Sequence, residues 1–154
     1  INNSEKNILS TLKSRCLDFK LKLSTNQSID ITNKILNTSY NDFLNKEFSN
    51  NYSTPGEILR LIDFANKNSI DLKKTNLHEL IKKIIMEKKY KKDTSLKELM
   101  YSLIEIYFRN NVSVYDTKLI TTYNYFLKKI KNVKTYNLDE ESVFMEFEDR
   151  VLNG

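Results

Sequence analysis

Five pairs of polar residues, each spanning three positions, constrain the fold of this chain more than any other feature. A Ser, Thr or Asn comes first, Glu or Gln stands three positions later, and apolar residues follow at helical spacing. The pairs are Ser24 with Gln27, Thr54 with Glu57, Asn76 with Glu79, Ser95 with Glu98, and Asn137 with Glu140. In such a capping box each side chain satisfies a free backbone amide at the start of a helix. The motif therefore predicts a chain built from helices.

The scarcity of glycine and proline supports the same conclusion. The 154 residues include two glycines and one proline, Pro55, which is well placed as the first residue of a helix after Thr54. Sandwiches, barrels and doubly wound folds need turn residues at each of their many connections, so the deficit favours helices joined by polar loops. We expect an all-α fold, long enough for one domain or two small ones.

Apolar stripes give the positions of the helices. The clearest stripe follows Ser95, and similar ones predict four amphipathic helices between residues 76 and 152. The stripe residues are Leu77, Leu80, Ile81, Ile84 and Ile85, then Leu96, Leu99, Met100, Leu103, Ile104, Tyr107 and Phe108, then Leu119, Ile120, Tyr123, Phe126, Leu127 and Ile130, then Val143, Phe144, Phe147 and Val151. Three shorter helices are expected over residues 24–37, 42–48 and 55–66.

The beginning of the chain has a different pattern. Residues 8–23, ILSTLKSRCLDFKLKL, change from helical spacing to the alternation of a strand at Ser14-Arg15-Cys16. A polar stretch over residues 66–76 indicates a domain boundary. We expect three parts: a helix and terminal strand over residues 1–23, a three-helix module over 24–67, and a helical bundle over 68–154.

Several classes of function are excluded by what the sequence lacks. With one Cys and one His it cannot form a Cys/His zinc cluster or an internal disulfide, and we expect no metal. With glycine only at positions 56 and 154 it has no Gly-rich phosphate loop, so this chain is expected to hold no nucleotide cofactor. The low cysteine count favours a reduced, cytoplasmic setting, and because no run of about 18 apolar residues is present we expect no membrane partner. The opening INNSEKN has no initiator Met, so we expect a part of a longer protein.

The remaining reactive side chains fit structural roles. We interpret His78 as a surface histidine and Cys16 as a buried thiol, although Arg15 beside it leaves an activated thiol open. The acidic residues near the end, Glu140, Glu141, Glu146, Glu148 and Asp149, are predicted to form a solvated face.

Lysines cluster in the second half and account for much of the formal net charge of +5. The first cluster includes Lys88, Lys89, Lys91 and Lys92, and a later one includes Lys128, Lys129, Lys131 and Lys134. They could contact nucleic-acid phosphates or an acidic partner. We favour a solvated lysine face, because no pattern of interleaved aromatic residues accompanies them.

The opening segment resembles the end of the ATPase domain in AAA+ clamp-loader subunits. There an apolar pair, a Thr and Ser-Arg-Cys lead into the last strand, and here Ile8-Leu9, Thr11 and Ser14-Arg15-Cys16 fill those places. A second match, YSTPGEILRLIDFA, is similar to the last lid helix of the delta-prime type in bacterial DNA polymerase III, with Thr54-Pro55-Gly56 at its start. The two matches cover residues from about 8 to 66, and the rest is similar only as a helical bundle where the family has its collar.

The resemblance implies a role in DNA replication. It implies that Arg15 is an arginine finger, a catalytic residue acting in trans on ATP bound by a neighbouring subunit. The other clamp-loader subunits would be partners through the collar, and the sliding clamp and primed DNA would be reached through the assembled complex. Arg15 could instead pair locally with Asp18. Upstream of Ile1 the resemblance implies about 150 residues of α/β pattern.

One departure bears on catalysis. Subunits of this family that hydrolyse ATP carry an Arg near the start of the last lid helix, whereas this sequence has Gly56-Glu57 there and Arg60 one turn later. This favours a non-catalytic or weakly catalytic subunit. The alternatives are a basic helical nucleic-acid-binding module and a helical adaptor. Tyr101, Tyr107, Tyr123 and Tyr125 are candidates for partner contacts, with a core role expected for most of them.

Overall fold

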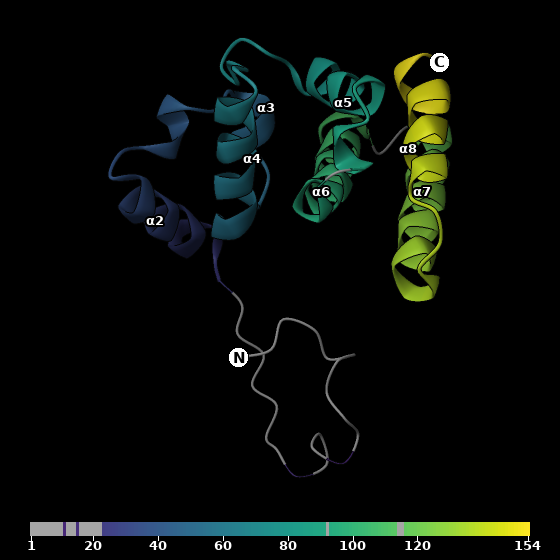
Figure 1. Cartoon of the computed structure of the whole chain (residues 1–154), viewed down its shortest axis with the longest axis horizontal. Coiled ribbons are helices and arrows are strands. Elements are labelled where there is room, and N and C mark those ends of the chain that lie inside the picture. The colour runs from purple at the N-terminus through teal and green to yellow at the C-terminus, as the bar shows by residue number, and fades with distance from the viewer. Residues whose placement is uncertain (1–10, 12–14, 16–22, 92, 114–115) are drawn as a thin grey trace.

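The structure is a computed structural model that describes residues 11, 15, 23–91, 93–113 and 116–154. Within these residues the fold is all-α, with seven α-helices, α2 to α8, and no strand (Figure 1). The all-α prediction is confirmed for this part of the chain. Of the strand expected at the end of the first segment, only Leu23 is described, as exposed and non-helical, and the rest lies outside the described residues.

The first half of the structure contains three α-helices, as the sequence predicts. They are α2 (Thr25–Leu36), α3 (Lys46–Ser49) and α4 (Pro55–Lys67), with a 3-10 turn, η2 (Tyr40–Asp42), before α3. The middle helix is shorter than expected because the side chain of Asn45 accepts the amide of Glu47, at 2.9 Å, and starts a new helix there. Capping boxes begin α2 at Ser24 and α4 at Thr54, as predicted.

The second half contains the four predicted helices. They are α5 (Leu77–Met86), α6 (Thr94–Asn111), α7 (Thr117–Tyr136) and α8 (Glu141–Phe147). A 3-10 turn, η3 (Lys89–Lys91), precedes α6, and α8 continues into a π-helical segment, η4 (Glu148–Leu152).

Two predicted caps are wrong, for electrostatic and conformational reasons. Helix α6 is capped by Asp93, whose carboxylate accepts the amide of Ser95 at 2.8 Å and suits the positive end of the helix dipole. Asn137 ends α7 instead of starting α8, because it adopts a left-handed conformation (φ 50°) and its amide bonds to the carbonyl of Val133.

Non-glycine residues adopt the left-handed backbone conformation that glycine usually provides. In the part of the chain that the structure describes, four non-glycine residues have φ between 49° and 55°: Asn37, Ser69, Lys88 and Asn137. Asparagine tolerates this conformation better than most residues, and both asparagines stand directly after a helix, where a left-handed residue stops it.

Helix α6 is at the centre of the fold. It packs against α4, α5 and α7, and Figure 1 shows α5 and α6 between the α2–α4 group and the α7–α8 pair. Every residue of its predicted stripe is buried except the half-buried Tyr107, and Tyr101 and Ile106 are buried as well. Buried side chains on more than one face identify α6 as an interior helix.

An aromatic cluster fills the space between α6, α7 and α8. The ring of Phe108 is fully buried, and four other rings have centroids 5.0 to 6.1 Å from it: Tyr123, Phe147, Phe126 and Tyr107. Most of these pairs are edge-on or tilted, the geometry favoured by the quadrupoles of aromatic rings.

The buried apolar side chains of the described residues form one continuous core, from Tyr40 to Leu152. Helix α4, before the predicted boundary, packs on α6, after it. The polar stretch between them is anchored by Leu72, which is only 3% exposed. The division of the chain at residue 68 stays a prediction.

Candidate functional site

Arg15 lies in an exposed turn. No described residue forms an ion pair with its guanidinium group. Its neighbours Ser14 and Cys16, and the local partner considered for it, Asp18, lie outside the described residues. The role of Arg15 as an arginine finger stays a prediction, and so does the interpretation of Ser14-Arg15-Cys16 as the clamp-loader motif.

The segment Thr54-Pro55-Gly56 forms the start of α4, as expected. The carboxylate of Glu57 accepts the backbone amide of Thr54 at 2.8 Å and its hydroxyl at 2.9 Å. A side chain at position 56 would meet only the guanidinium of Arg60, at 3.8 Å from the added Cβ. Arg60 folds back so that its Nε donates to the carbonyl of Gly56 at 3.1 Å. Packing therefore does not require glycine at this position.

Glu57 also ties α4 to the central helix. Its second carboxylate oxygen accepts the hydroxyl of Ser102 in α6 at 2.8 Å. Burial alone would raise the pKa of Glu57, but the hydrogen bonds from Thr54 and Ser102 outweigh it and lower that pKa below its ordinary value. This carboxylate is a structural link between two helices.

Three of the four lysines proposed for phosphate contacts have partners within the chain. Lys88 and Lys91 pair with Glu141 at 2.9 and 2.6 Å. Lys89 pairs with Glu87, and its amine donates to the side chain of Asn68 at 2.5 Å. Lys92 lies outside the described residues. These contacts favour a structural role for this lysine cluster.

Three of the five acidic residues near the end of the chain, Glu140, Glu141 and Glu146, differ from the solvated face that the sequence predicts. Glu140 pairs with Lys97 of α6 at 3.0 Å, and Glu141 pairs with Lys88 and with Lys91 of η3. The carboxylate of Glu146 accepts a hydrogen bond from the hydroxyl of Tyr125 at 2.9 Å and one from the guanidinium of Arg150 at 2.7 Å. It also forms an ion pair with Lys129 of α7. These three carboxylates therefore hold α8 onto its neighbours, whereas no described residue forms an ion pair with Glu148 or Asp149. No group of three or more His, Cys, Asp or Glu in the described part of the chain could hold a metal ion.

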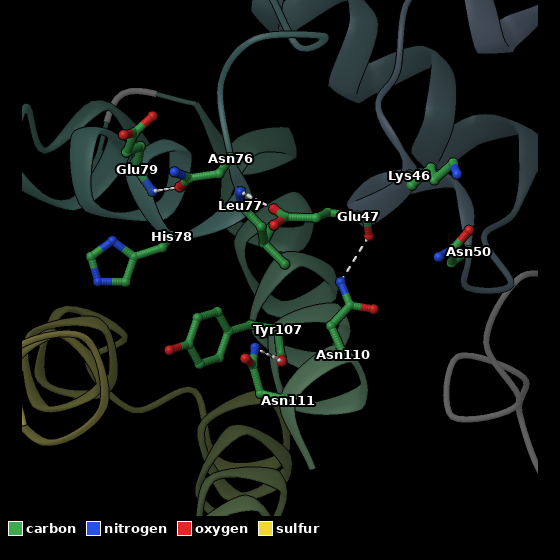
Figure 2. Close-up of a pocket in the computed structure, with 10 residues that line it drawn as sticks. All are labelled: Lys46, Glu47, Asn50, Asn76, Leu77, His78, Glu79, Tyr107, Asn110 and Asn111. Carbon is green, nitrogen blue, oxygen red and sulfur yellow. Dashed lines mark hydrogen bonds between the residues drawn. The ribbon is translucent and has the colours of Figure 1, made fainter. Parts of the chain in front are cut away.

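A polar cleft of about 580 Å³ lies where α3, the first turn of α5 and the last turn of α6 meet (Figure 2). Sequence reasoning did not find this site, because its residues are ordinary polar ones from three separate segments. The residues that line it are Lys46, Glu47, Asn50, Asn76, Leu77, His78, Glu79, Tyr107, Asn110 and Asn111. The asparagines do not indicate a site in the sequence, because Asn is frequent throughout this chain.

Hydrogen bonds hold the walls of the cleft in place. Glu47 accepts the amide of Leu77 at 2.7 Å, and its carbonyl accepts the side chain of Asn110 at 2.9 Å, so one residue of α3 joins α5 and α6 (Figure 2). His78, expected at the surface, is half-buried, and its Nε2 lies 3.0 Å from the carbonyl of Leu152. Because a carbonyl only accepts, Nε2 is the donor in this contact, and in the neutral imidazole Nδ1 is then the acceptor.

The four tyrosines considered for partner contacts lie at different depths. Tyr101 is 5% exposed, Tyr107 and Tyr123 are half-buried, and Tyr125 is 42% exposed but bonded to Glu146. Burial raises the pKa of Tyr107, whose ring lies beside His78 with centroids 6.5 Å apart. Of the four, Tyr107 alone lines the cleft.

Comparisons with family models, curated proteins and solved structures found no match. Among the described residues, no helix is both long and apolar enough to cross a bilayer.

Proposed function

We propose that this chain is the lid and collar part of a clamp-loader subunit in DNA replication, with a structural and regulatory role. Its helices scaffold the ring of subunits, and Arg15 is presented to the ATP site of a neighbouring subunit. The observation that carries the proposal is an exposed arginine, in the Ser14-Arg15-Cys16 sequence, ahead of an all-helical body. ATP would be bound by the neighbour.

The helical body supports this proposal in two ways. Helix α4 begins at Thr54-Pro55-Gly56, as the second resemblance implies for the last lid helix. The carboxylates of Glu140, Glu141 and Glu146 are engaged in ion pairs with lysines of other segments, which suits a scaffold better than a catalytic centre.

The nucleic-acid-binding alternative has less support. It depends on the lysine clusters, and Lys88, Lys89 and Lys91 are paired with carboxylates of the same chain. Lys129 and Lys134 also form ion pairs, with Glu146 and Glu98. Paired lysines release fewer counterions on binding a phosphate backbone, so they add less to affinity.

The test uses the full-length protein, reconstituted with clamp-loader subunits from the same organism. DNA-stimulated ATP hydrolysis is compared for the wild type and Arg15→Ala. A finger in trans predicts a loss of about 10³-fold at the neighbouring site. Arg15→Lys should not restore the rate, because lysine lacks the planar guanidinium group.

Arg109→Ala is the matched control. Arg109 is another exposed arginine, and it pairs with Glu105 of its own helix at 2.5 Å. This variant should hydrolyse ATP at the wild-type rate. An unchanged rate for Arg15→Ala in an intact complex would refute the finger, and failure of the wild type to join any clamp-loader complex would refute the function.

A further inference from the structure

We infer that the polar cleft between α3, α5 and α6 binds an extended peptide segment of another protein, through the main chain of that segment. The inference stands apart from the clamp-loader proposal, since it rests only on the groups that line the cleft.

The first argument is a set of polar groups in the cleft that form no hydrogen bond with any described residue. On the α5 wall these are the Nδ2 amide of Asn76, a donor, and Nδ1 of His78, an acceptor. On the α6 wall they are the hydroxyl of Tyr107, which can donate, and Oδ1 of Asn111, an acceptor. Three of these side chains are held in place by hydrogen bonds from their other polar atoms. Oδ1 of Asn76 accepts the amide of Glu79 at 2.8 Å, and Nε2 of His78 bonds the carbonyl of Leu152. Nδ2 of Asn111 donates to the carbonyl of Tyr107 at 2.7 Å.

This set matches the hydrogen-bonding pattern of an extended chain. Each edge of a β-strand presents N–H and C=O groups in turn, so a wall that faces it needs both acceptors and donors. The two walls of the cleft each provide one of each kind. Figure 2 shows Asn76 and His78 on one side and Tyr107 and Asn111 on the other.

The second argument is the charge at the two ends of the cleft. Lys46 and Glu79 are exposed, and neither forms an ion pair with a described residue. Figure 2 shows Lys46 beside Asn50 at one end and Glu79 near His78 at the other. The cleft therefore suits a segment with an acidic residue toward Lys46 and a basic residue toward Glu79.

Other ligand classes fit less well. A phosphate group needs several converging cations, and the lining has one lysine against two carboxylates, Glu47 and Glu79. An apolar small molecule needs a mostly apolar lining, and here the aliphatic lining residue is Leu77. The volume of about 580 Å³ is within the range of about 300–1,000 Å³ for ligand pockets and suits a few residues of extended chain.

The test is a titration of the ¹⁵N-labelled 154-residue chain with two pools of capped pentapeptides, followed by NMR. One pool is acetyl-Asp-Xaa-Xaa-Xaa-Lys-amide and the other has Lys first and Asp last. We expect saturable shifts of the side-chain amide signals of Asn76 and Asn111 with one pool. The same pool with N-methyl groups on the three central residues should not bind, because it has lost the main-chain donors.

Variants of the cleft make the test specific. Asn111→Ala and Tyr107→Phe should each weaken binding about 5- to 10-fold, as expected for one lost hydrogen bond. Asn132→Ala, at an exposed position of α7, is the matched control and should leave binding unchanged. The double variant Lys46→Glu with Glu79→Lys should bind the pool of opposite charge order.

Two results would overturn the inference. One is the absence of saturable shifts with both pools, provided that the wild-type spectrum is that of a folded chain. The other is equal binding of the N-methylated pool, which would mean that the main chain is not recognised. Peptide binding with no effect of Arg15→Ala on ATP hydrolysis would support this inference and refute the arginine finger, so the two proposals can fail separately.

Discussion

The hydroxyl of Ser102 donates a 2.8 Å hydrogen bond to the carboxylate of Glu57, a residue that lies 45 positions earlier in the sequence. The same carboxylate caps the start of α4 through Thr54. One side chain therefore both begins a helix and fixes that helix against the central α6.

This double role can be measured with a double-mutant cycle. Ser102→Ala should lower the free energy of unfolding by about 1 kcal/mol. Glu57→Ala should cost about 1–2 kcal/mol, because it also removes half of the capping box. The double variant should cost less than the sum of the two, as measured by urea unfolding. Strict additivity would show that the two side chains do not interact in solution.

The pH dependence of stability follows from the lowered pKa of Glu57. The folded state holds this pKa below the ordinary value of 4.5, so the unfolded chain binds the proton more tightly. The stabilisation is complete above the ordinary pKa and is lost as the pH falls below about 4.5 and through the folded pKa. Urea midpoints between pH 3 and 7 should therefore decrease toward acid, and Glu57→Gln should reduce the slope. An unchanged slope in that variant would contradict the assignment.

The aromatic cluster should dominate the stability of the second half of the fold. Phe108→Ala leaves a cavity among four rings and should cost about 3–5 kcal/mol. If that variant does not fold, Phe108→Leu keeps more of the volume and should cost about 1.5 kcal/mol. Tyr136→Ala, at a position 69% exposed, should change stability by no more than about 0.5 kcal/mol. Thermal unfolding monitored by circular dichroism would rank the three.

The ion pairs of α8 should make its attachment sensitive to salt. Glu146→Gln weakens contacts with Lys129 and Arg150, and we expect a loss of about 1 kcal/mol or less, since these groups are partly solvated. The loss should shrink as NaCl rises to about 1 M. Asp149→Asn is the control, because Asp149 is exposed and no described residue forms an ion pair with it. If the loss of stability in Glu146→Gln were independent of salt, it would come from altered packing of the side chain and not from the lost ion pairs.

Ser69 offers a stabilising substitution. Its φ of 53° is left-handed, and its side chain is exposed. Ser69→Gly removes the steric cost of this conformation and should raise the free energy of unfolding, by up to about 1 kcal/mol after the added entropy of the unfolded chain. Ser69→Val should lower it, because a β-branched residue tolerates this conformation poorly. Chemical denaturation of the two variants would give opposite shifts of the midpoint.

Local signals were sufficient for most of the helices and for part of their ends. The caps at Ser24, Thr54 and Asn76 depend on residues within one turn, so the sequence predicts them correctly. The pairs at Ser95 and Asn137 have the same spacing, but Asp93 competes successfully for the first and a left-handed conformation is adopted at the second. The spacing of two residues gives no information about a competing cap such as Asp93 or about the backbone conformation at Asn137.

The cleft and the ion pairs of α8 could not be predicted in the same way. Glu47, Leu77 and Asn110 meet only because α3, α5 and α6 are packed together. The acidic residues of α8 have the spacing of a solvated face, and their lysine partners are contributed by η3, α6 and α7.

The sequence by itself determined the all-helical class, the positions of the amphipathic helices and most of the residues that they bury, because helix periodicity and capping act over a few neighbouring residues. Only the tertiary structure decided which carboxylates meet which lysines, that α6 is interior, and that three segments enclose a polar cleft. Those outcomes depend on contacts between residues that are far apart in the chain, and hydrophobic burial, which drives such contacts, specifies no particular partner.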